Sequence, residues 1–317
     1  MKRAVAGWRA LPVALVVCAG GLLAGANAQA PVTQTGTGES AWTIGIYTGP
    51  SPFQLSPPAN VSNPVLTGAD VTDLKVDTLA HPFMVIEGAR YYLFFTAKDH
   101  KADKGGIGLA ESADGLRWKF RRTVIHESFV TSHPYVFKWE NQYYMIPEAH
   151  TEKSVRLYRA TAFPDKWEYE RDLLTGDQHY ISPTVVRYRG MWWMFVAPSG
   201  NDTVQLFYAS ALKGHWTEHP LSPIVKNGPH TARPAGRPFV IDGALYRLGM
   251  DCEPAYGSQV RAFRITEIGT RTYAEKMIEA PLVKASSRGW NAEAMHHVDA
   301  HRIGKDKWIA AVDALGR

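Results

Sequence analysis

The chain has 317 residues, of which 45% are hydrophobic, and it carries 35 basic against 30 acidic residues. A chain of this length and hydrophobicity can fold around a core of its own as one domain. It contains no run of Lys and Arg interleaved with aromatic residues, so its charge pattern argues against a nucleic-acid partner.

The first 28 residues have the three-part layout of a secretory signal peptide. Lys2, Arg3 and Arg9 flank the start of an apolar run over residues 11–23, and the small residues of 26–28 suit cleavage after Ala28. The apolar run is shorter than the about 20 residues that a membrane-spanning helix needs. We therefore expect a periplasmic or secreted protein with no stable membrane insertion after cleavage.

Two segments lie between the leader and the repeated part of the chain. Residues 29–40 are polar and rich in Thr and Gly, which predicts a flexible N-terminus before a single domain over residues 41–317. Residues 41–47 have the composition of a strand. Residues 48–65 contain five prolines, which predicts an extended loop.

A repeated pattern organises the rest of the chain. Its five copies begin 49 to 59 residues apart, at His81, His133, Ser182, Arg237 and His296. Each copy has a β-rich run, a turn of Gly, Asn or charged residues, and a second β-rich run, which is the signature of a hairpin. Most copies continue with a third strand. Three to four strands in each repeat, without helical periodicity, predict the blades of a β-propeller.

The two ends of the domain complement each other. The fifth copy ends after two strands, whereas residues 41–47 have strand character and no blade of their own. A ring of blades removes two free sheet edges when one terminus completes the last blade. The sequence therefore predicts an all-β, five-bladed β-propeller whose last blade is completed by the N-terminal strand.

Polar residues recur at the corners of the predicted blades. The first strand starts and the second strand ends at the same mouth of the channel. The five corners pair His81 with Thr96, His133 with Glu148, Ser182 with Ala197, Arg237 with Asp251, and His296 or His297 with Asp313. Buried carboxylates and imidazoles need partners, which favours a shared functional site over a channel that binds only water.

The corner residues suggest acid–base chemistry on a carbohydrate. Glu148 and Asp251 are the predicted catalytic pair, because each ends a strongly patterned second strand beside a basic corner residue, and Asp313 competes for the same role. The predicted substrate-binding residues are His81, His133, Arg237, Trp290, His296 and His297, with Trp290 as a surface for stacking on a sugar ring. The histidines could instead bind a transition metal, but we favour hydrogen bonding to a polyhydroxylated ligand and predict no metal site.

The chain resembles a known group of proteins over residues 41–314. The repeated hairpin that starts with a polar residue before Pro resembles the family 43 and related glycoside hydrolases, which are five-bladed propellers. A narrower group is more similar: a family-43-like domain that also occurs as the N-terminal part of plant glucosamine inositolphosphorylceramide transferase. The segments that carry this resemblance are IGIYTGPSPFQL, NPVLTGADVTD, SHPYVFKWENQYYMIPEAHTEKSVRLYRA, ARPAGRPFVIDGALYRLGMDCEPAYG and WNAEAMHHVDAHRI.

The resemblance implies a carbohydrate substrate and three acidic residues at the channel mouth, and this chain departs from that pattern. His81 and His133 stand where family 43 has acidic residues, and the third corner, Ser182 with Ala197, offers no carboxylate. We therefore expect an exported glycoside hydrolase or transglycosylase that uses Glu148, Asp251 and Asp313. A glycan-binding propeller without catalysis is the alternative, and a phosphorolytic enzyme is a third. We predict no cofactor, while a Ca²⁺ ion in the channel, as in some propeller hydrolases, is left open.

Overall fold

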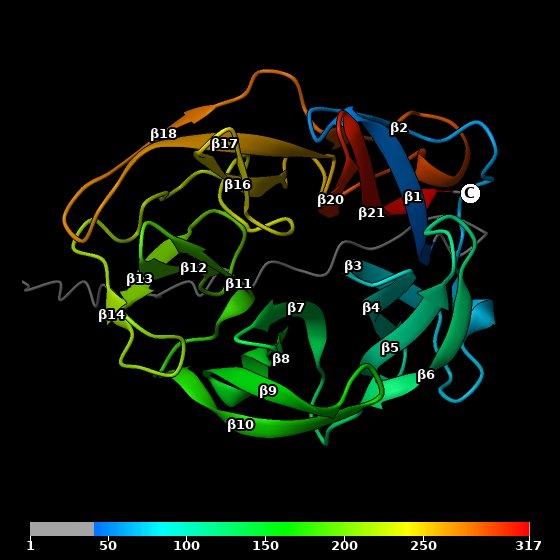
Figure 1. Cartoon of the computed structure of the whole chain (residues 1–317), viewed down its shortest axis with the longest axis horizontal. Helices are drawn as coiled ribbons and strands as arrows, with labels where there is room; N and C mark the ends of the chain where they lie inside the picture. The colour runs from blue at the N-terminus through cyan, green and yellow to red at the C-terminus, as the bar shows by residue number, and fades with distance from the viewer. Residues whose placement is uncertain (1–40, 317) are drawn as a thin grey trace, which may run out of the picture. The chain divides into compact units, whose positions relative to one another are not determined.

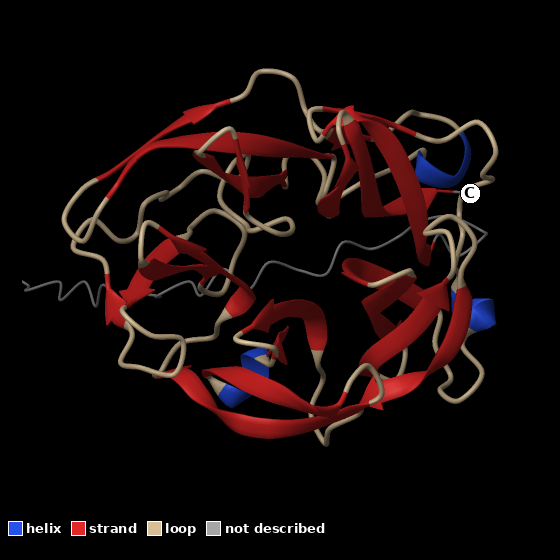
Figure 2. Cartoon of the chain, in the orientation of Figure 1, coloured by secondary structure: helices blue, strands red, loops and turns tan. Residues whose placement is uncertain are grey.

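The computed structural model describes residues 41–316. The predicted signal peptide and the predicted flexible segment over residues 29–40 lie outside the described residues. Nearly all the regular structure is β, and it is arranged as five antiparallel sheets (Figure 2). Three short 3₁₀ helices lie in loops of the described chain: η1 (Gly68–Asp70), η2 (His150–Glu152) and η3 (Gly289–Asn291).

Four of the five sheets are blades made of strands that follow one another along the chain, and they are numbered here in chain order (Figure 1). Blade 1 consists of β3 (Thr78–Glu87), β4 (Arg90–Asp99), β5 (Lys104–Ser112) and β6 (Lys119–Ile125). Blade 2 consists of β7 (Ser132–Trp139), β8 (Gln142–Glu148), β9 (Ser154–Ala162) and β10 (Lys166–Thr175). Blade 3 consists of β11 (Ile181–Tyr188), β12 (Met191–Ala197), β13 (Gln205–Ala209) and β14 (Thr217–Glu218). Blade 4 consists of β15 (Phe239–Ile241), β16 (Ala244–Asp251), β17 (Gln259–Ile268) and β18 (Tyr273–Met277), with β19 (Val283–Lys284) paired to β17.

The fifth blade joins the two ends of the described chain. Its strand order is β2-β1-β21-β20, with β1 (Ala41–Ser51) and β2 (Gln54–Ser56) from the start, and β20 (Val298–Gly304) and β21 (Lys307–Gly316) from the end. β1 pairs antiparallel with β21 from Ala41 opposite Gly316 to Gly49 opposite Trp308. The predicted five-bladed propeller, closed by the N-terminal strand, is confirmed. The extended loop expected over residues 48–65 is wrong in part, because the end of β1 and all of β2 fall within it.

The inner strands are apolar because neighbouring blades cover both of their faces. In β4, Phe94 and Phe95 point to opposite sides of the blade, and both are fully buried. Phe94 meets Trp167 of blade 2 at a centroid distance of 5.5 Å, while Phe95 belongs to the same core cluster as Ile46 of the fifth blade. This packing on two sides holds the inner edge of each blade in a fixed position at the channel.

Two predicted strand starts need correction. The fourth inner strand is short and begins at Phe239 rather than at Arg237, and the fifth begins at Val298 rather than at His296. In blade 4 the chain pairs with β16 already at Arg233, whose carbonyl accepts the Met250 N–H at 2.8 Å, and at Pro234, opposite Gly249. The corner residue of this blade is therefore Arg233. The sequence has an Arg-Pro pair at both positions, and only the pairing of strands distinguishes them.

Candidate functional site

Three blades begin with the same unusual backbone conformation at one mouth of the channel. His81, His133 and Ser182 each precede a proline and have φ values of 50°, 45° and 51°. In all three blades the pairing of the first two strands shifts in register at this point, as in a β-bulge. Left-handed backbone at residues other than glycine costs about 1–3 kcal/mol and is concentrated at functional sites.

Each bulged residue is held by the neighbouring blade. Its backbone N–H donates to a side chain at or near the end of the second strand of the preceding blade in the ring. The three bonds run from His81 to Asp313 (2.8 Å), from His133 to Thr96 (2.9 Å) and from Ser182 to Glu148 (2.7 Å). The corners therefore also pair between blades, and not only within a blade as predicted. The reason is that each second strand ends beside the start of the next blade at the mouth.

Four predicted binding residues, all histidines, do come together at this mouth. His296 stacks on His81 with ring centroids 4.7 Å apart, and Trp42 stacks on the other side of His296 at 3.7 Å. His133 and His297 meet His81 edge to face, at 5.4 Å and 5.8 Å. Of these, His133, His296 and His297 are fully or almost fully buried.

The imidazoles of this cluster are neutral and under-satisfied. Burial holds the pKa of His81, His133 and His296 well below the usual value, and it lowers the pKa of His297 to about 4. His81 Nε2 and both ring nitrogens of His133 and His297 are buried without a hydrogen-bond partner among the described residues. Unpaired buried polar groups are costly, so the cluster offers donors and acceptors to a ligand or to ordered water.

The three predicted catalytic carboxylates differ in what their oxygens already accept. Both oxygens of Asp313 are engaged, by His296 Nδ1 at 2.7 Å and by the His81 N–H at 2.8 Å, and its side chain is fully buried. Asp313 therefore orients His296 and holds the backbone of His81. Glu148 and Asp251 are slightly exposed, at 7% and 5%.

Asp251 accepts three hydrogen bonds. His230 Nδ1 at 2.9 Å and the Glu253 N–H at 3.2 Å donate to Oδ1, and Gln259 donates to Oδ2 at 2.8 Å. Burial opposes ionisation, but these bonds outweigh it and lower the pKa of Asp251, so the side chain stays a carboxylate. One acceptor position on Oδ2 is left for a ligand.

Glu148 has a whole oxygen without a hydrogen bond in the described structure. Its Oε2 accepts the Ser182 N–H, which fixes the carboxylate, while Oε1 has only His150 Nδ1 nearby, at 3.6 Å. Arg233 Nη2 lies 3.9 Å from Oε2. A carboxylate that is fixed through one oxygen and open at the other is suited to proton transfer.

Two predicted binding residues lie elsewhere. Arg237 forms an ion pair with the buried Asp299, with Nε 2.6 Å from Oδ1. It lines a pocket of 650 Å³ together with Gly88 and Lys138, at the hairpin-turn end of the inner strands and so at the other mouth. Trp290, in η3, packs against Gly45 of β1 and meets the Tyr47 ring at 6.4 Å. Neither residue is placed with the histidine cluster.

The structure adds site residues that sequence reasoning missed. Arg233 donates to Asn201 Oδ1 at 2.8 Å and lies over the ring of Tyr256 at 5.4 Å. Tyr256 and Trp42 meet edge to face at 6.4 Å, so the aromatic part of the mouth is formed by these two rings. The proline after Arg233 was the one available signal, since His81, His133 and Ser182 also precede proline.

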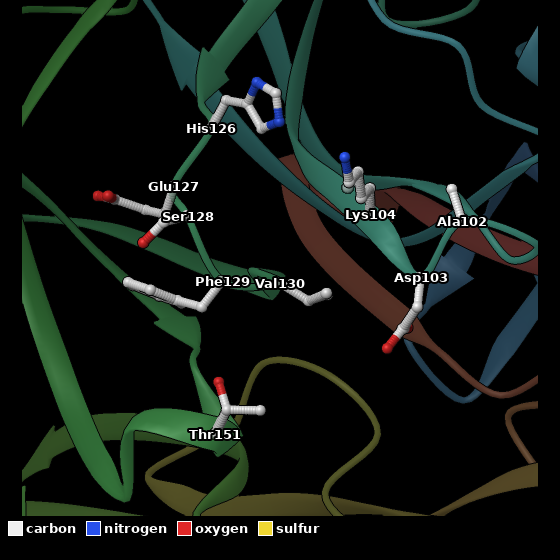
Figure 3. Close-up of a pocket in the computed structure, with 10 residues that line it drawn as sticks. Ala102, Asp103, Lys104, His126, Glu127, Ser128, Phe129, Val130 and Thr151 are labelled. Atoms are coloured by element: carbon white, nitrogen blue, oxygen red, sulfur yellow. The ribbon is translucent and has the colours of Figure 1, made fainter.

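A pocket of 540 Å³ opens at the same mouth between blades 1 and 2 (Figure 3). Three loops form it: the β4–β5 loop with Asp103, the β6–β7 loop with His126 to Val130, and η2 with Thr151. Figure 3 shows the Phe129 ring and the Ser128 and Thr151 hydroxyls around the opening. Such a mixture of an aromatic ring and short polar groups suits a sugar.

The donor atoms at the channel centre do not fit a directly bound Ca²⁺ ion. Ca²⁺ takes six to eight oxygen ligands, whereas the centre offers imidazole nitrogens and the nearest carboxylate, Asp313, is already engaged. Within residues 41–316, no group of three or more His, Cys, Asp or Glu residues is arranged to hold a metal.

The five sheets around one channel define the class of fold: a five-bladed β-propeller. The fold is similar to the catalytic domain of the Coprinopsis cinerea GH62 α-L-arabinofuranosidase, with a TM-score of 0.59 and 13% identity over 87% of this chain and 97% of that one. It is also similar to the α-L-arabinofuranosidase of Podospora anserina, with a TM-score of 0.60 and 10% identity over 88% and 97%. The α-L-arabinanase of Cellvibrio cellulosa has a TM-score of 0.55 and 15% identity over 75% of this chain and 90% of that one. The TM-scores establish a shared fold, and at these low identities they establish the fold alone.

The sequence comparisons identify a specific family within this fold. Residues 35–315 match the family described as "Glucosamine inositolphosphorylceramide transferase 1, N-terminal", and the chain belongs to this family, as its sequence predicts. It is 35% identical to glucosamine inositolphosphorylceramide transferase 1 of Oryza sativa subsp. japonica over 300 residues, which are 87% of this chain and 40% of the relative. The Arabidopsis thaliana protein of the same name is 33% identical over 302 residues, with 87% and 39% covered. The chain thus spans about two fifths of the length of these relatives. In the described residues, no helix is long and apolar enough to span a membrane.

Proposed function

We propose that this chain is an exported glycosidase or transglycosylase that acts on a glycan at the histidine-lined mouth of the channel. Glu148 is its general acid, and Asp251 is the ionised carboxylate that acts as base. The observation that carries the proposal is the state of Glu148, fixed by the Ser182 N–H through one oxygen and open at the other. The fold similarity to α-L-arabinofuranosidases and an α-L-arabinanase supports a carbohydrate ligand without identifying the sugar.

The remaining site residues supply binding. The neutral imidazoles of His81, His133 and His297 can donate to and accept from sugar hydroxyls, since each neutral ring has one donor and one acceptor. Asp313 positions His296 through Nδ1, which leaves the other ring nitrogen for the ligand. Trp42 and Tyr256 give the apolar ring faces on which sugars stack.

The second candidate is a glycan-binding propeller without catalysis. It is favoured by the use of Glu148 and Asp313 as acceptors for backbone N–H groups at the bulges, which is a structural role. It is also favoured by the curated relatives, which are named as transferases and extend well beyond the matched part. The two candidates differ in whether bound glycan is turned over.

Removal of the Glu148 carboxylate separates the candidates. We expect Glu148→Gln to lower sugar release from a responsive polysaccharide by about 10²–10⁴-fold, the usual contribution of a general acid, with little change in affinity. Release is followed by reducing-end analysis over a glycan panel with and without phosphate, beside calorimetric binding to the same panel. Glu140→Gln, at the turn end of the same hairpin, is the matched control and should match wild type.

Three outcomes are informative. Saturable binding without release by the wild-type chain supports the binding propeller. Release that requires added phosphate indicates phosphorolysis. If Glu148→Gln and Asp251→Asn both leave release unchanged, these carboxylates are not the catalytic pair and the mechanism is wrong.

A further inference from the structure

Three arginine side chains lie deep in the described fold, and they differ in how their charges are balanced. Arg237 is paired with Asp299, through Nε at 2.6 Å and Nη2 at 3.3 Å. Arg247 is paired with Glu275, also through two nitrogens. A buried charge is tolerated when it has such a partner. The charges of these two arginines are therefore balanced without a ligand.

Arg233 has no hydrogen-bonded carboxylate among the described residues. Its side chain is only 14% exposed, and its nearest carboxylate oxygen is Glu148 Oε2, at 3.9 Å. That distance is too long for a hydrogen bond, and the same oxygen already accepts the Ser182 N–H at 2.7 Å. Arg233 donates instead to two neutral oxygens, to Asn201 Oδ1 at 2.8 Å and weakly to Ser182 Oγ at 3.4 Å.

The guanidinium therefore keeps hydrogen-bonding capacity at the mouth. Of its five N–H groups, those on Nη2 have no hydrogen-bond partner in the described part of the chain. Arg233 reaches the corners of several blades, because it contacts Ser182 of blade 3, Glu148 of blade 2 and Tyr256 of the β16–β17 loop. It also lies close enough to His296 to disfavour a positive charge on that ring. With the surrounding imidazoles neutral, Arg233 is the permanent positive charge of the site.

We propose that Arg233 binds an anionic group of the ligand, so that this site takes an acidic glycan whose sugar carries a carboxylate or a phosphate. The inference rests on the proposed carbohydrate function and narrows it to one class. A planar guanidinium matches the two oxygens of a carboxylate or phosphate in a bidentate arrangement. The neutral imidazoles then bind the hydroxyls of the same sugar.

The test compares acidic glycans with neutral partners of the same length. Oligogalacturonides and oligoglucuronides are each measured beside their carboxyl-reduced forms, and phosphorylated mannooligosaccharides beside their dephosphorylated forms, by calorimetry with the full chain. We expect at least one acidic member to bind about 10- to 100-fold more tightly than its neutral partner, the range for a hydrogen bond to a charged group. The pair that responds shows whether the anion is a carboxylate or a phosphate.

Variants of Arg233 test whether this residue causes the preference for acidic glycans. Arg233→Gln should bring the two affinities of the responding pair within about 3-fold of each other, and Arg233→Lys should retain part of the preference because it keeps the charge. Arg302→Gln, an exposed arginine near the other mouth, is the control and should keep the full preference. Equal affinities in the wild-type chain, or a preference that survives Arg233→Gln, would overturn the proposal.

A second measurement needs no variant. In wild-type protein, an anion bound beside Arg233 favours the charged form of the nearby imidazole, so NMR titration should show a higher pKa for His296 with the acidic glycan and no rise with its neutral partner. The absence of that difference would also overturn the proposal. Release of neutral sugars without charge preference contradicts only this inference, whereas charge-selective binding without any release contradicts only the glycosidase. Absence of binding to every glycan contradicts both.

Discussion

At the scale of single residues, the four clustered histidines place imidazole groups inside the core of the propeller. His297 is fully buried and lacks a partner for either ring nitrogen among the described residues. Its burial disfavours the imidazolium form, and the neighbouring Asp313 and Asp299 only partly offset this effect. Keeping these imidazoles neutral and without partners at the channel therefore costs stability.

This burial predicts a pH-dependent stability. The folded pKa of His297 is lowered to about 4, below the unfolded value of about 6.5. Below about pH 6.5 the unfolded chain therefore binds a proton at His297 that the folded chain does not bind, and the folded state loses stability as the pH falls towards 4. Each unit of pKa difference corresponds to about 1.4 kcal/mol. We expect the free energy of unfolding to fall by about 3 kcal/mol between pH 6.5 and pH 4 from His297 alone. His81, His133 and His296 act in the same direction.

Denaturant unfolding at half-unit steps of pH measures this effect. His297→Gln, which cannot ionise, should flatten the decline below pH 6.5 by up to about 1.4 kcal/mol per pH unit. The window ends near pH 4, above the range in which Asp251 titrates in the folded protein, because the pKa of Asp251 is lowered. Identical slopes for the two proteins would show that folding does not lower the pKa of His297.

At the scale of elements, the strand β1 decides whether the ring is closed. Its residues Ile44 and Ile46 are fully buried and belong to a core shared with blade 1. The Ile46 N–H donates to Asn63 Oδ1 at 2.9 Å, which also ties the following loop to the strand. β1 is therefore part of the packed core, and the first and last blades depend on it.

We expect Ile46→Ala to lower the free energy of unfolding by about 2–5 kcal/mol, the usual cost of truncating a buried aliphatic side chain. Ile303→Ala, in β20 of the same blade, is the matched control and should change stability by less than about 0.5 kcal/mol, because Ile303 is 43% exposed. Denaturant unfolding reports both values. If Ile46→Ala only increases local amide exchange in β1 and leaves global unfolding unchanged, the strand opens independently of the ring.

At the scale of the whole molecule, Asp299 connects three blades through its hydrogen bonds. It lies on β20 of the fifth blade and accepts the Met84 N–H of blade 1 at 2.6 Å and Arg237 of blade 4 at 2.6 Å. Burial alone would raise its pKa, but Arg237 and His301 outweigh burial and hold the pKa of Asp299 well below the usual value. Asp299 therefore stays ionised and acts as a structural link between blades.

Loss of this carboxylate should lower the stability of the whole propeller. We expect Asp299→Asn to lower the free energy of unfolding by about 3–5 kcal/mol, because it leaves Arg237 buried without its partner. The double variant Asp299→Asn with Arg237→Met should recover part of this loss, since no uncompensated charge remains. Urea unfolding of the single and double variants tests the prediction. Equal stability of wild type and Asp299→Asn would mean that solvent, rather than Asp299, balances Arg237.

The sequence by itself determined the fold and its closure, because each blade repeats a local pattern of alternating strands and turns that can be counted along the chain. It also brought His81, His133, His296 and His297 to one mouth, because their positions within the repeats are equivalent. Only the tertiary structure decided the charges of the site. Whether Arg233 or Arg237 forms the corner depends on strand pairing, and which carboxylates remain open depends on donors from neighbouring blades, such as the Ser182 N–H on Glu148. Those partners lie tens to hundreds of residues away, where no local pattern can place them.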